Sequence, residues 1–251
     1  MKPSLLAIAG LDPTGGAGLL ADAKTFHHFG FHAQACATAF TAQNSQSFAR
    51  LQPANADLFR EQFLAIHNQG EIAGYKIGMM AQGELVQLLA ELFQSNPPRL
   101  VVLDPVLVSS TGRPLLDPSG QTALKQLLLP WADLVTPNLA EAYALTGIRV
   151  ADAATAQAAG QALLGLGAKA ALIKGGHLVG DPVDWLVSPS LFQTFSGTRI
   201  PHDPRGTGCH LSSAILALMA QGQPLPAAVS QAKAWLAGLI QKSYAAQSPL
   251  L

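Results

Sequence analysis

Short apolar runs alternate along this chain with longer segments in which apolar residues recur at helical spacing. This alternation is typical of β-α-β units and of a largely parallel sheet. The apolar runs predict strands at residues 5–9, 33–39, 74–77, 100–103, 134–136 and 170–174. The periodic segments predict helices at residues 17–29, 56–68, 83–93, 119–128, 139–145 and 155–166.

The pattern changes after residue 180. Segments 183–187 and 191–195 flank Ser188-Pro189-Ser190 and predict a hairpin. Two further helices are expected at about residues 208–220 and 227–244. Because no repeat, low-complexity tract or long linker divides the sequence, we expect one α/β domain spanning residues 1–251.

The composition fits a large core that is covered on both sides. Hydrophobic residues make up 49% of the 251 residues and charged residues 12%, and 15 basic and 15 acidic side chains give a net charge of zero. Without a basic stripe or tail, we expect no binding to nucleic acid. No apolar stretch approaches the ~18 residues of a membrane helix. The apolar run after Met1 is too short for a signal peptide, so we expect a cytoplasmic protein without a membrane partner.

The two cysteines, Cys36 and Cys209, lie far apart and fit no zinc or redox spacing. A core of this size requires no disulfide, which favours a reducing compartment. Cys36 lies within an apolar strand and is expected to be a small core residue.

Open parallel sheets bind ligands outside the carboxyl ends of their strands, and here those positions carry polar residues. Asp104 follows the strand at 100–103, and Lys174 ends the strand at 170–174, before Gly175-Gly176-His177. A carboxylate there can organise a hard cation, and a lysine followed by glycines can contact phosphate. Ordinary turns at the ends of strands use the same residue types, so both interpretations stay open.

The strongest single feature is Gly206-Thr207-Gly208-Cys209, which precedes an apolar helix. Two glycines permit a tight turn whose N–H groups, with the positive end of the helix, bind negative charge. Such a nest suits a phosphoryl group during transfer. We expect the helix terminus to lower the pKa of Cys209 towards neutrality, so that it serves as a base or polar neighbour of the attacking hydroxyl. The alternative is a glycine-rich helix start with an inert buried cysteine.

Thr136-Pro137-Asn138-Leu139-Ala140-Glu141 follows another predicted strand. Asn138 and Glu141 have the spacing of a capping box, which is the structural interpretation. In the functional interpretation Glu141 lies near Mg²⁺ or its waters, since hard cations take oxygen ligands.

Near the start, Gly10-Leu11-Asp12-Pro13-Thr14-Gly15-Gly16-Ala17-Gly18 forms a loop that leads into a helix. It is not a P-loop, because no Gly-Lys-Ser/Thr follows. It also lacks the ribose-binding acid of a dinucleotide site, because no Asp or Glu occurs between Asp22 and Asp57. This disfavours a Rossmann dehydrogenase and leaves the loop as backbone that lines a small-molecule pocket.

These features follow one another in a specific order, which also includes Ala21-Asp22, Ala42-Gln43-Asn44, Lys76-Ile77-Gly78-Met79 and Pro114-Leu115-Leu116. From about residue 4 to residue 240 the chain resembles the hydroxymethylpyrimidine/phosphomethylpyrimidine kinases of thiamin biosynthesis, which have a ribokinase-like fold. The resemblance implies three αβα layers around a mostly parallel sheet. It also implies phosphorylation of 4-amino-5-hydroxymethyl-2-methylpyrimidine and of its monophosphate, with ATP and Mg²⁺, by a homodimer.

The resemblance also assigns roles to individual residues. It implies that the pyrimidine contacts Gly10, Asp22, Gln43, Met79 and Val106. Cys209 matches the catalytic position, with Gly206, Thr207 and Gly208 as the anion hole. Asp104 and Glu141 match positions that organise Mg²⁺–ATP, and Lys174, Asn138 and Arg205 are expected near the nucleotide.

Two departures from the family pattern lie near the expected phosphates. Ser109-Ser110 stands where many relatives have a lysine, for which Arg113 is a possible substitute. Pro204-Arg205 replaces Thr-His, and Arg205 is a candidate for recognising an anionic group on the substrate. The second phosphorylation is therefore left open, and two alternatives remain. One is a pyridoxal kinase on the same fold, and the other is a non-catalytic pyrimidine-binding sensor.

Overall fold

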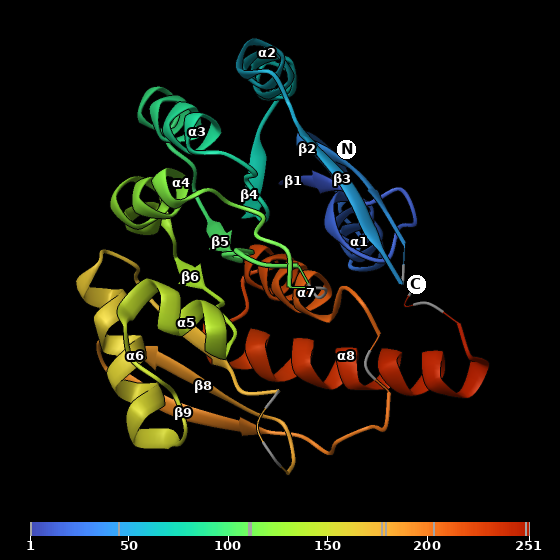
Figure 1. Ribbon diagram of the computed structural model, residues 1–251, viewed down its shortest axis with the longest axis vertical. Helices are drawn as coiled ribbons and strands as arrows, with labels where there is room; N and C mark the ends of the chain where they lie inside the picture. The colour runs from blue at the N-terminus through green and yellow to red at the C-terminus, as the bar shows by residue number, and fades with distance from the viewer. Residues whose placement is uncertain are drawn as a thin grey trace.

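Strands from most of the chain join one sheet, which the computed structural model describes for residues 2–44, 46–109, 112–176, 178, 180–202, 204–248 and 250. Within these residues the strand order is β3-β2-β1-β4-β5-β6-β7-β8-β9 (Figure 1). The bounds are β1 Ser4–Leu11, β2 His32–Gln43, β3 Phe48–Pro53, β4 Ile72–Ile77, β5 Val101–Leu103, β6 Leu134–Val135, β7 Ala171–Lys174, β8 Val183–Ser188 and β9 Leu191–Ser196. Neighbours from β2 to β7 in this order are parallel, whereas β3, β8 and β9 add antiparallel pairs at the two edges.

Helices cover both faces of the sheet. Their bounds are α1 Gly18–His28, α2 Ala56–His67, α3 Gly83–Ser95, α4 Pro118–Ala123, α5 Leu139–Thr146, α6 Ala153–Gly165, α7 Thr207–Ala220 and α8 Leu225–Ala246. In Figure 1, α1, α7 and α8 lie on one side of the sheet and α2 to α6 on the other. The three αβα layers expected from the family resemblance are therefore confirmed.

The central strand β1 shows why the sequence has no alternation of polar and apolar residues there. Leu6 and Ile8 belong to the core under α2 to α6, and Leu5 and Ala7 belong to the core under α1, α7 and α8. All four side chains are fully buried. Parallel strands covered on both faces read as continuous apolar runs, which is the signal that predicted them.

The predicted elements are present, with two local differences. The sequence pattern did not predict β3, because this edge strand is mostly exposed or half-buried and has no apolar run. The helix expected at residues 119–128 is α-helical only in α4 and continues as a π-helical turn, Leu124–Leu128. Among the described residues, no helix is long and apolar enough to cross a membrane.

Candidate active site

The carboxyl ends of β5 and β7 carry an ion pair. The Nζ atom of Lys174 lies 2.8 Å from Oδ1 of Asp104, and Thr136 Oγ1 donates to the same oxygen at 3.2 Å. Burial alone would raise the pKa of Asp104, but the positive charges of Lys174 and Lys76 outweigh it and lower that pKa. The structure thus brings together two of the predicted strand-end residues as a charged pair.

Glu141 lies beside this pair, at the start of α5. Its carboxylate accepts from the backbone N–H of Asn138 at 2.8 Å, and Asn138 Oδ1 accepts from Glu141 N at 2.9 Å. The capping-box interpretation is therefore confirmed. Glu141 is only 5% exposed, and burial raises the pKa of its carboxyl to about 7 although Lys174 opposes the shift.

These residues fit a magnesium ion that is bound partly by protein carboxylates and partly by the phosphate oxygens of a nucleotide. Among the residues that the structure describes, no group of three or more His, Cys, Asp or Glu side chains could hold a metal by itself. Two carboxylates, Asp104 and Glu141, nevertheless act electrostatically on each other and on Lys174. Mg²⁺ is commonly bound by one or two carboxylates plus phosphate oxygens and waters, and this donor set suits that mode.

The glycine turn before α7 contains a left-handed residue and packs closely against another loop. Gly206 is left-handed, with φ of 82°, and a Cβ atom there would lie 2.0 Å from the carbonyl oxygen of Gly16. A Cβ atom on Gly208 would lie 3.2 Å from Lys174 Nζ and 3.6 Å from an oxygen of Asp104. The positive end of α7 therefore faces the Lys174–Asp104 pair, and the Gly15–Gly18 loop packs against its turn.

The expectation of a lowered thiol pKa at Cys209 was wrong. Cys209 is half-buried, and desolvation raises the pKa of its thiol to about 11, although Lys76 opposes this. A helix terminus stabilises a thiolate only where the negative charge also keeps some solvation or a close cation. In this site the loss of solvation dominates, so Cys209 is a neutral thiol near pH 7.

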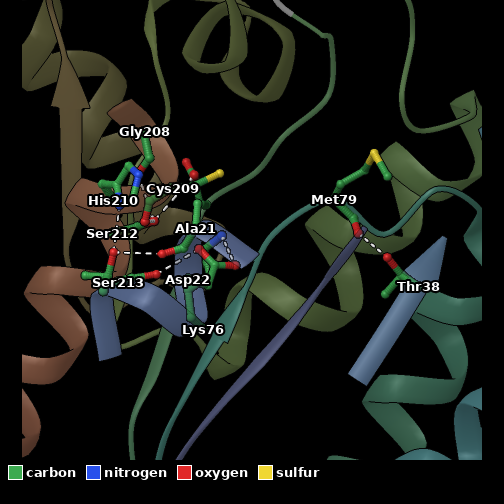
Figure 2. A network of polar contacts seen from close by, with 12 residues as sticks. Ala21, Asp22, Thr38, Lys76, Met79, Gly208, Cys209, His210, Ser212 and Ser213 are labelled. Carbon is green, nitrogen blue, oxygen red and sulfur yellow. Dashed lines mark hydrogen bonds and ion pairs between the residues drawn. The ribbon is translucent and has the colours of Figure 1, made fainter. Parts of the chain in front are cut away.

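A second ion pair lies within the core next to Cys209. Figure 2 shows Lys76 and Asp22 in contact, with Nζ 2.9 Å from Oδ2, and Ser213 Oγ donating to the other carboxylate oxygen at 2.8 Å. Both charged side chains are fully buried. Burial alone would lower the pKa of Lys76, but the negative charges around it, Asp22 first, raise that pKa.

This packing bears on the role expected for Asp22. Both oxygens of its carboxylate already have partners, and the side chain is fully enclosed. Direct contact with a pyrimidine would require this packing to open. The sequence assigns no role to Lys76, although a charged residue inside the apolar strand Ile72–Ile77 is a signal of a buried ion pair.

The remaining residues expected at the pyrimidine gather on the other side of the glycine turn. Met79 packs in a small apolar cluster, and Val106 lies against it; the cluster also contains Ala39, Ala81 and Leu115. A Cβ atom on Gly10 would lie 2.1 Å from the terminal methyl of Met79, so the Met79 side chain lies directly against the backbone of Gly10. Thr38 Oγ1 donates to the backbone oxygen of Met79 at 2.5 Å, as Figure 2 shows.

Arg205, which was expected near the nucleotide, contacts Gln43, one of the residues expected at the pyrimidine. Its Nη2 atom is 3.2 Å from Oδ2 of Asp12 and 2.5 Å from Oε1 of Gln43. The end of β2 and the loop after β1 therefore meet at the guanidinium of Arg205, which lies in the turn before α7. Arg113, the suggested substitute for the lysine that many relatives have at Ser109-Ser110, donates to the carbonyls of Phe48 and Ala49. Ser110 and His177 lie outside the described residues.

A cavity of about 660 Å³ opens on the nucleotide side of α7. Among the residues expected to bind nucleotide or anion, Asn138, Lys174, Thr207 and Gly208 line it. Its volume is within the ~300–1,000 Å³ range of small-molecule sites. The residues expected at the pyrimidine are not among those that line it, so the two expected sets occupy different parts of the described structure.

Sequence reasoning missed several residues that line this cavity. Arg199 Nε donates to Gly180 O at 2.6 Å, and its Nη2 donates to the carbonyls of Gly176 and Leu178. Lys233 Nζ lies 2.5 Å from Asp184, whose other oxygen accepts from the backbone N–H of Gly175. These side chains hold the glycine turn after Lys174. No motif marks them, because their partners are mainly backbone carbonyls far away in the sequence.

Comparison with known proteins gives a consistent result. A family model described as phosphomethylpyrimidine kinase matches residues 12–249. A hydroxymethylpyrimidine/phosphomethylpyrimidine kinase of Aquifex aeolicus is 40% identical over 240 residues, which covers 95% of this chain and 94% of the relative. The corresponding enzyme of Haemophilus influenzae is 40% identical over 94% of this chain and 90% of its own length.

Two solved structures show the same fold. A phosphomethylpyrimidine kinase of Clostridium difficile superimposes with a TM-score of 0.85 at 34% identity, over 94% of this chain and 99% of the other. A pyridoxal kinase of Staphylococcus aureus, solved with pyridoxal, has a TM-score of 0.88 at 28% identity, over 96% and 88% of the two chains.

Proposed function

The chain belongs to the phosphomethylpyrimidine kinase family, and from this premise we propose that it transfers the γ-phosphoryl group of ATP to 4-amino-5-hydroxymethyl-2-methylpyrimidine in thiamin biosynthesis. We extend the proposal to the monophosphate, which would become the diphosphate. The family match is the main support for this class of substrate. The separation between the residues expected at the nucleotide and those expected at the pyrimidine also supports the proposal.

The start of α7 would hold the group in transfer. The N–H groups of residues 206–208 and the positive helix end would bind the charge that spreads over a phosphoryl group in its transition state. Lys174 would contact the phosphates from the cavity, since its Nζ lies 3.2 Å from the position of a Cβ atom on Gly208. This juxtaposition of Lys174 and Gly208 is the observation on which the mechanism rests.

Asp104 and Glu141 would hold Mg²⁺ together with phosphate oxygens. When bound, the ion would neutralise charge on the β- and γ-phosphates. Asn138 would keep Glu141 in place through the capping box, because each residue bonds the backbone N–H of the other. The negative phosphates of the nucleotide would compete with Asp104 for Lys174 and would thereby weaken this ion pair.

Cys209 would act as a polar neighbour of the attacking hydroxyl and not as a thiolate base. Its thiol stays protonated near neutral pH because burial raises the pKa to about 11. Phosphoryl transfer with a loose transition state depends mainly on positioning and charge stabilisation. The hydroxyl would therefore lose its proton late, to an oxygen of the transferred phosphoryl group, and the thiol would orient the acceptor oxygen.

We also propose that the protein works in the cytoplasm as a homodimer of single-domain subunits, as the family resemblance implies. Light scattering on the purified protein tests the oligomeric state. A monomer at the concentrations used in the activity assay would contradict this part of the proposal without affecting the reaction.

Mass spectrometry of the products tests the function directly. The protein is incubated with Mg–ATP and the hydroxymethylpyrimidine, and in parallel with pyridoxal. Monophosphate followed by diphosphate is the expected result. Monophosphate alone would restrict the enzyme to the first step. Phosphorylation of pyridoxal alone would overturn the choice of substrate, and no product from either compound would overturn the kinase reaction.

A further inference from the structure

We propose that Arg205 is a positioning residue that fixes the side-chain amide of Gln43, and thereby makes the pocket selective for a ring with an amino group next to a ring nitrogen. The inference rests on the proposed function, since it takes Gln43 to face the pyrimidine. It concerns how this chain's own Pro204-Arg205 turn contributes to recognition.

Three separate segments meet at the guanidinium of Arg205. Gln43 ends β2, Asp12 follows β1, and Arg205 lies in the turn directly before α7. Arg205 Nη2 donates to Oε1 of Gln43 at 2.5 Å and to Oδ2 of Asp12 at 3.2 Å. The side chain of Asp12 is 1% exposed and that of Arg205 is 20% exposed, so the contact is shielded from most of the solvent.

Asp12 is itself held in one orientation. Its Oδ1 atom accepts from the backbone N–H of Thr14 at 3.0 Å and from the hydroxyl of Thr14 at 2.8 Å. This leaves Oδ2 directed at Arg205. At 3.2 Å the contact is an ion pair with a carboxylate of fixed orientation, so the loop after β1 helps to set the position of the guanidinium.

The hydrogen bonds on both sides of Gln43 determine which way its amide points. A guanidinium has donors only, so the atom of Gln43 facing Arg205 must be the acceptor Oε1. On the other side Thr41 Oγ1 donates to the backbone oxygen of Leu11 at 2.8 Å, so it accepts from Nε2 of Gln43 at 2.9 Å. Both neighbours therefore require the same orientation.

This orientation leaves a defined pair of groups for a ligand. One N–H of Nε2 and one lone pair of Oε1 remain after the contacts with Thr41 and Arg205. The N–H can donate to a ring nitrogen, and the adjacent Oε1 can accept from an exocyclic amino group beside that nitrogen. If the amide rotated by 180°, donor would face donor and acceptor would face acceptor, and each mismatched polar group would lose its hydrogen bond on desolvation.

Arg205→Met tests the inference, because it removes the guanidinium and keeps most of the apolar stem. Binding of the hydroxymethylpyrimidine without nucleotide is measured by calorimetry, alongside an analogue that lacks the 4-amino group. We expect affinity for the pyrimidine to fall about tenfold, while affinity for the analogue changes little. Arg205→Lys should restore part of the selectivity, since lysine can still pair with Asp12.

A double-mutant cycle separates positioning from general damage. If Arg205 acts through Gln43, then Gln43→Met combined with Arg205→Met should bind the pyrimidine as Gln43→Met alone does. Arg60→Met is the matched control, because Arg60 forms a surface pair with Glu91 on α2 and α3, at 3.6 Å. Its affinities should equal those of the unchanged protein.

Three results would overturn the inference. Additive losses in the double mutant would show that Arg205 does not act through Gln43. Equal weakening of the pyrimidine and its analogue by Arg205→Met would remove the role in selectivity. A loss confined to the monophosphate would show that the guanidinium contacts phosphate instead. If the unchanged protein neither binds nor phosphorylates the pyrimidine, the proposed function itself fails, which is a separate outcome.

Discussion

Lys174 ends β7 and Asp104 directly follows β5, and β6 separates these strands in the sheet, yet the two side chains form an ion pair 2.8 Å long. The pair lies where the start of α7 meets the cavity. In the proposed reaction, Lys174 would turn from Asp104 to the phosphates of the nucleotide, and Asp104 would bind the cation that accompanies them.

Lys174→Met leaves the carboxylate of Asp104 without its main partner. Removal of one member of a buried pair is costly, so we expect the free energy of unfolding to fall by about 3 kcal/mol. Phosphoryl transfer should fall by roughly 100-fold in kcat/KM, because the charge near the phosphates is lost. Urea unfolding and steady-state kinetics measure the two effects.

The surface pair of Lys169 with Asp133 provides the control, because its distance is 2.7 Å and Lys169 is 68% exposed. Exposed pairs contribute about 0–1 kcal/mol, so Lys169→Met should leave both measurements nearly unchanged. Equal effects of the two substitutions would contradict the role given to the buried pair.

The thiol of Cys209 should react slowly with alkylating reagents. Burial raises its pKa from 9.0 to about 11, and only the thiolate is nucleophilic. At pH 8 we expect alkylation by iodoacetamide about 100-fold slower than for free cysteine, since two pKa units correspond to that factor in thiolate. Mass spectrometry of a Cys36→Ser variant isolates the signal, and a rate equal to that of free cysteine would show an activated thiol.

His210 should make the protein less stable in mild acid. It is fully buried, its Nδ1 lies 2.7 Å from the hydroxyl of Thr25, and burial lowers its pKa from 6.5 to about 4. The folded state therefore favours the neutral ring. Its contribution is fully present above pH 6.5 and is lost as the pH falls towards 4, by about 1.4 kcal/mol per pH unit and about 3 kcal/mol in total.

Urea titrations between pH 7 and pH 4.5 measure this effect. A His210→Gln variant should lose this part of the pH dependence, whereas a variant of the exposed His32, His32→Gln, should keep it. Identical slopes for the unchanged protein and for His210→Gln would show that His210 does not cause the acid sensitivity.

Gly206→Ala should damage the site more than an equivalent change elsewhere. Gly206 combines a positive φ of 82° with a Cβ position only 2.0 Å from the carbonyl oxygen of Gly16. Gly147 also has a positive φ, of 77°, but nothing lies within 4 Å of its Cβ position. We expect Gly147→Ala to cost about 1 kcal/mol and Gly206→Ala at least ~2–3 kcal/mol, because the second also displaces backbone.

Activity distinguishes the two glycines further. Gly206→Ala should lower kcat strongly, because the N–H groups at the start of α7 lose their alignment, whereas Gly147→Ala should retain full kcat at a temperature where it is folded. Loss of stability without loss of kcat in Gly206→Ala would show that the turn is only structural.

The fold could be predicted from the sequence because β1, β4 and β5 are buried on both faces and therefore read as apolar runs. β3 could not, since an edge strand without a buried residue and with polar residues such as Arg50 and Gln52 gives no such run. The general rule that ligands bind outside the carboxyl ends of the strands pointed to Asp104 and Lys174 separately, and the structure brings the two side chains together.

Two features of the site lay beyond the sequence. The contacts of Arg205 join residues that are 162 and 193 positions away, and a single sequence carries no information on which distant residues touch. The pKa of Cys209 was predicted from its position at a helix terminus alone. The direction of the pKa shift depends on how far the surrounding layers exclude water, which only the packed structure determines.

The position of α7 has a consequence for biosynthesis. This late helix contacts β4 and β5 as well as α1, which the ribosome releases long before it. Until α7 emerges, an apolar face of those strands has no cover, and nascent chains with such faces are prone to aggregate. The partly made protein is therefore a natural client for chaperones. Because the turn that we propose to bind phosphate opens the same helix, a nascent chain would lack that part of the site until its own core is closed.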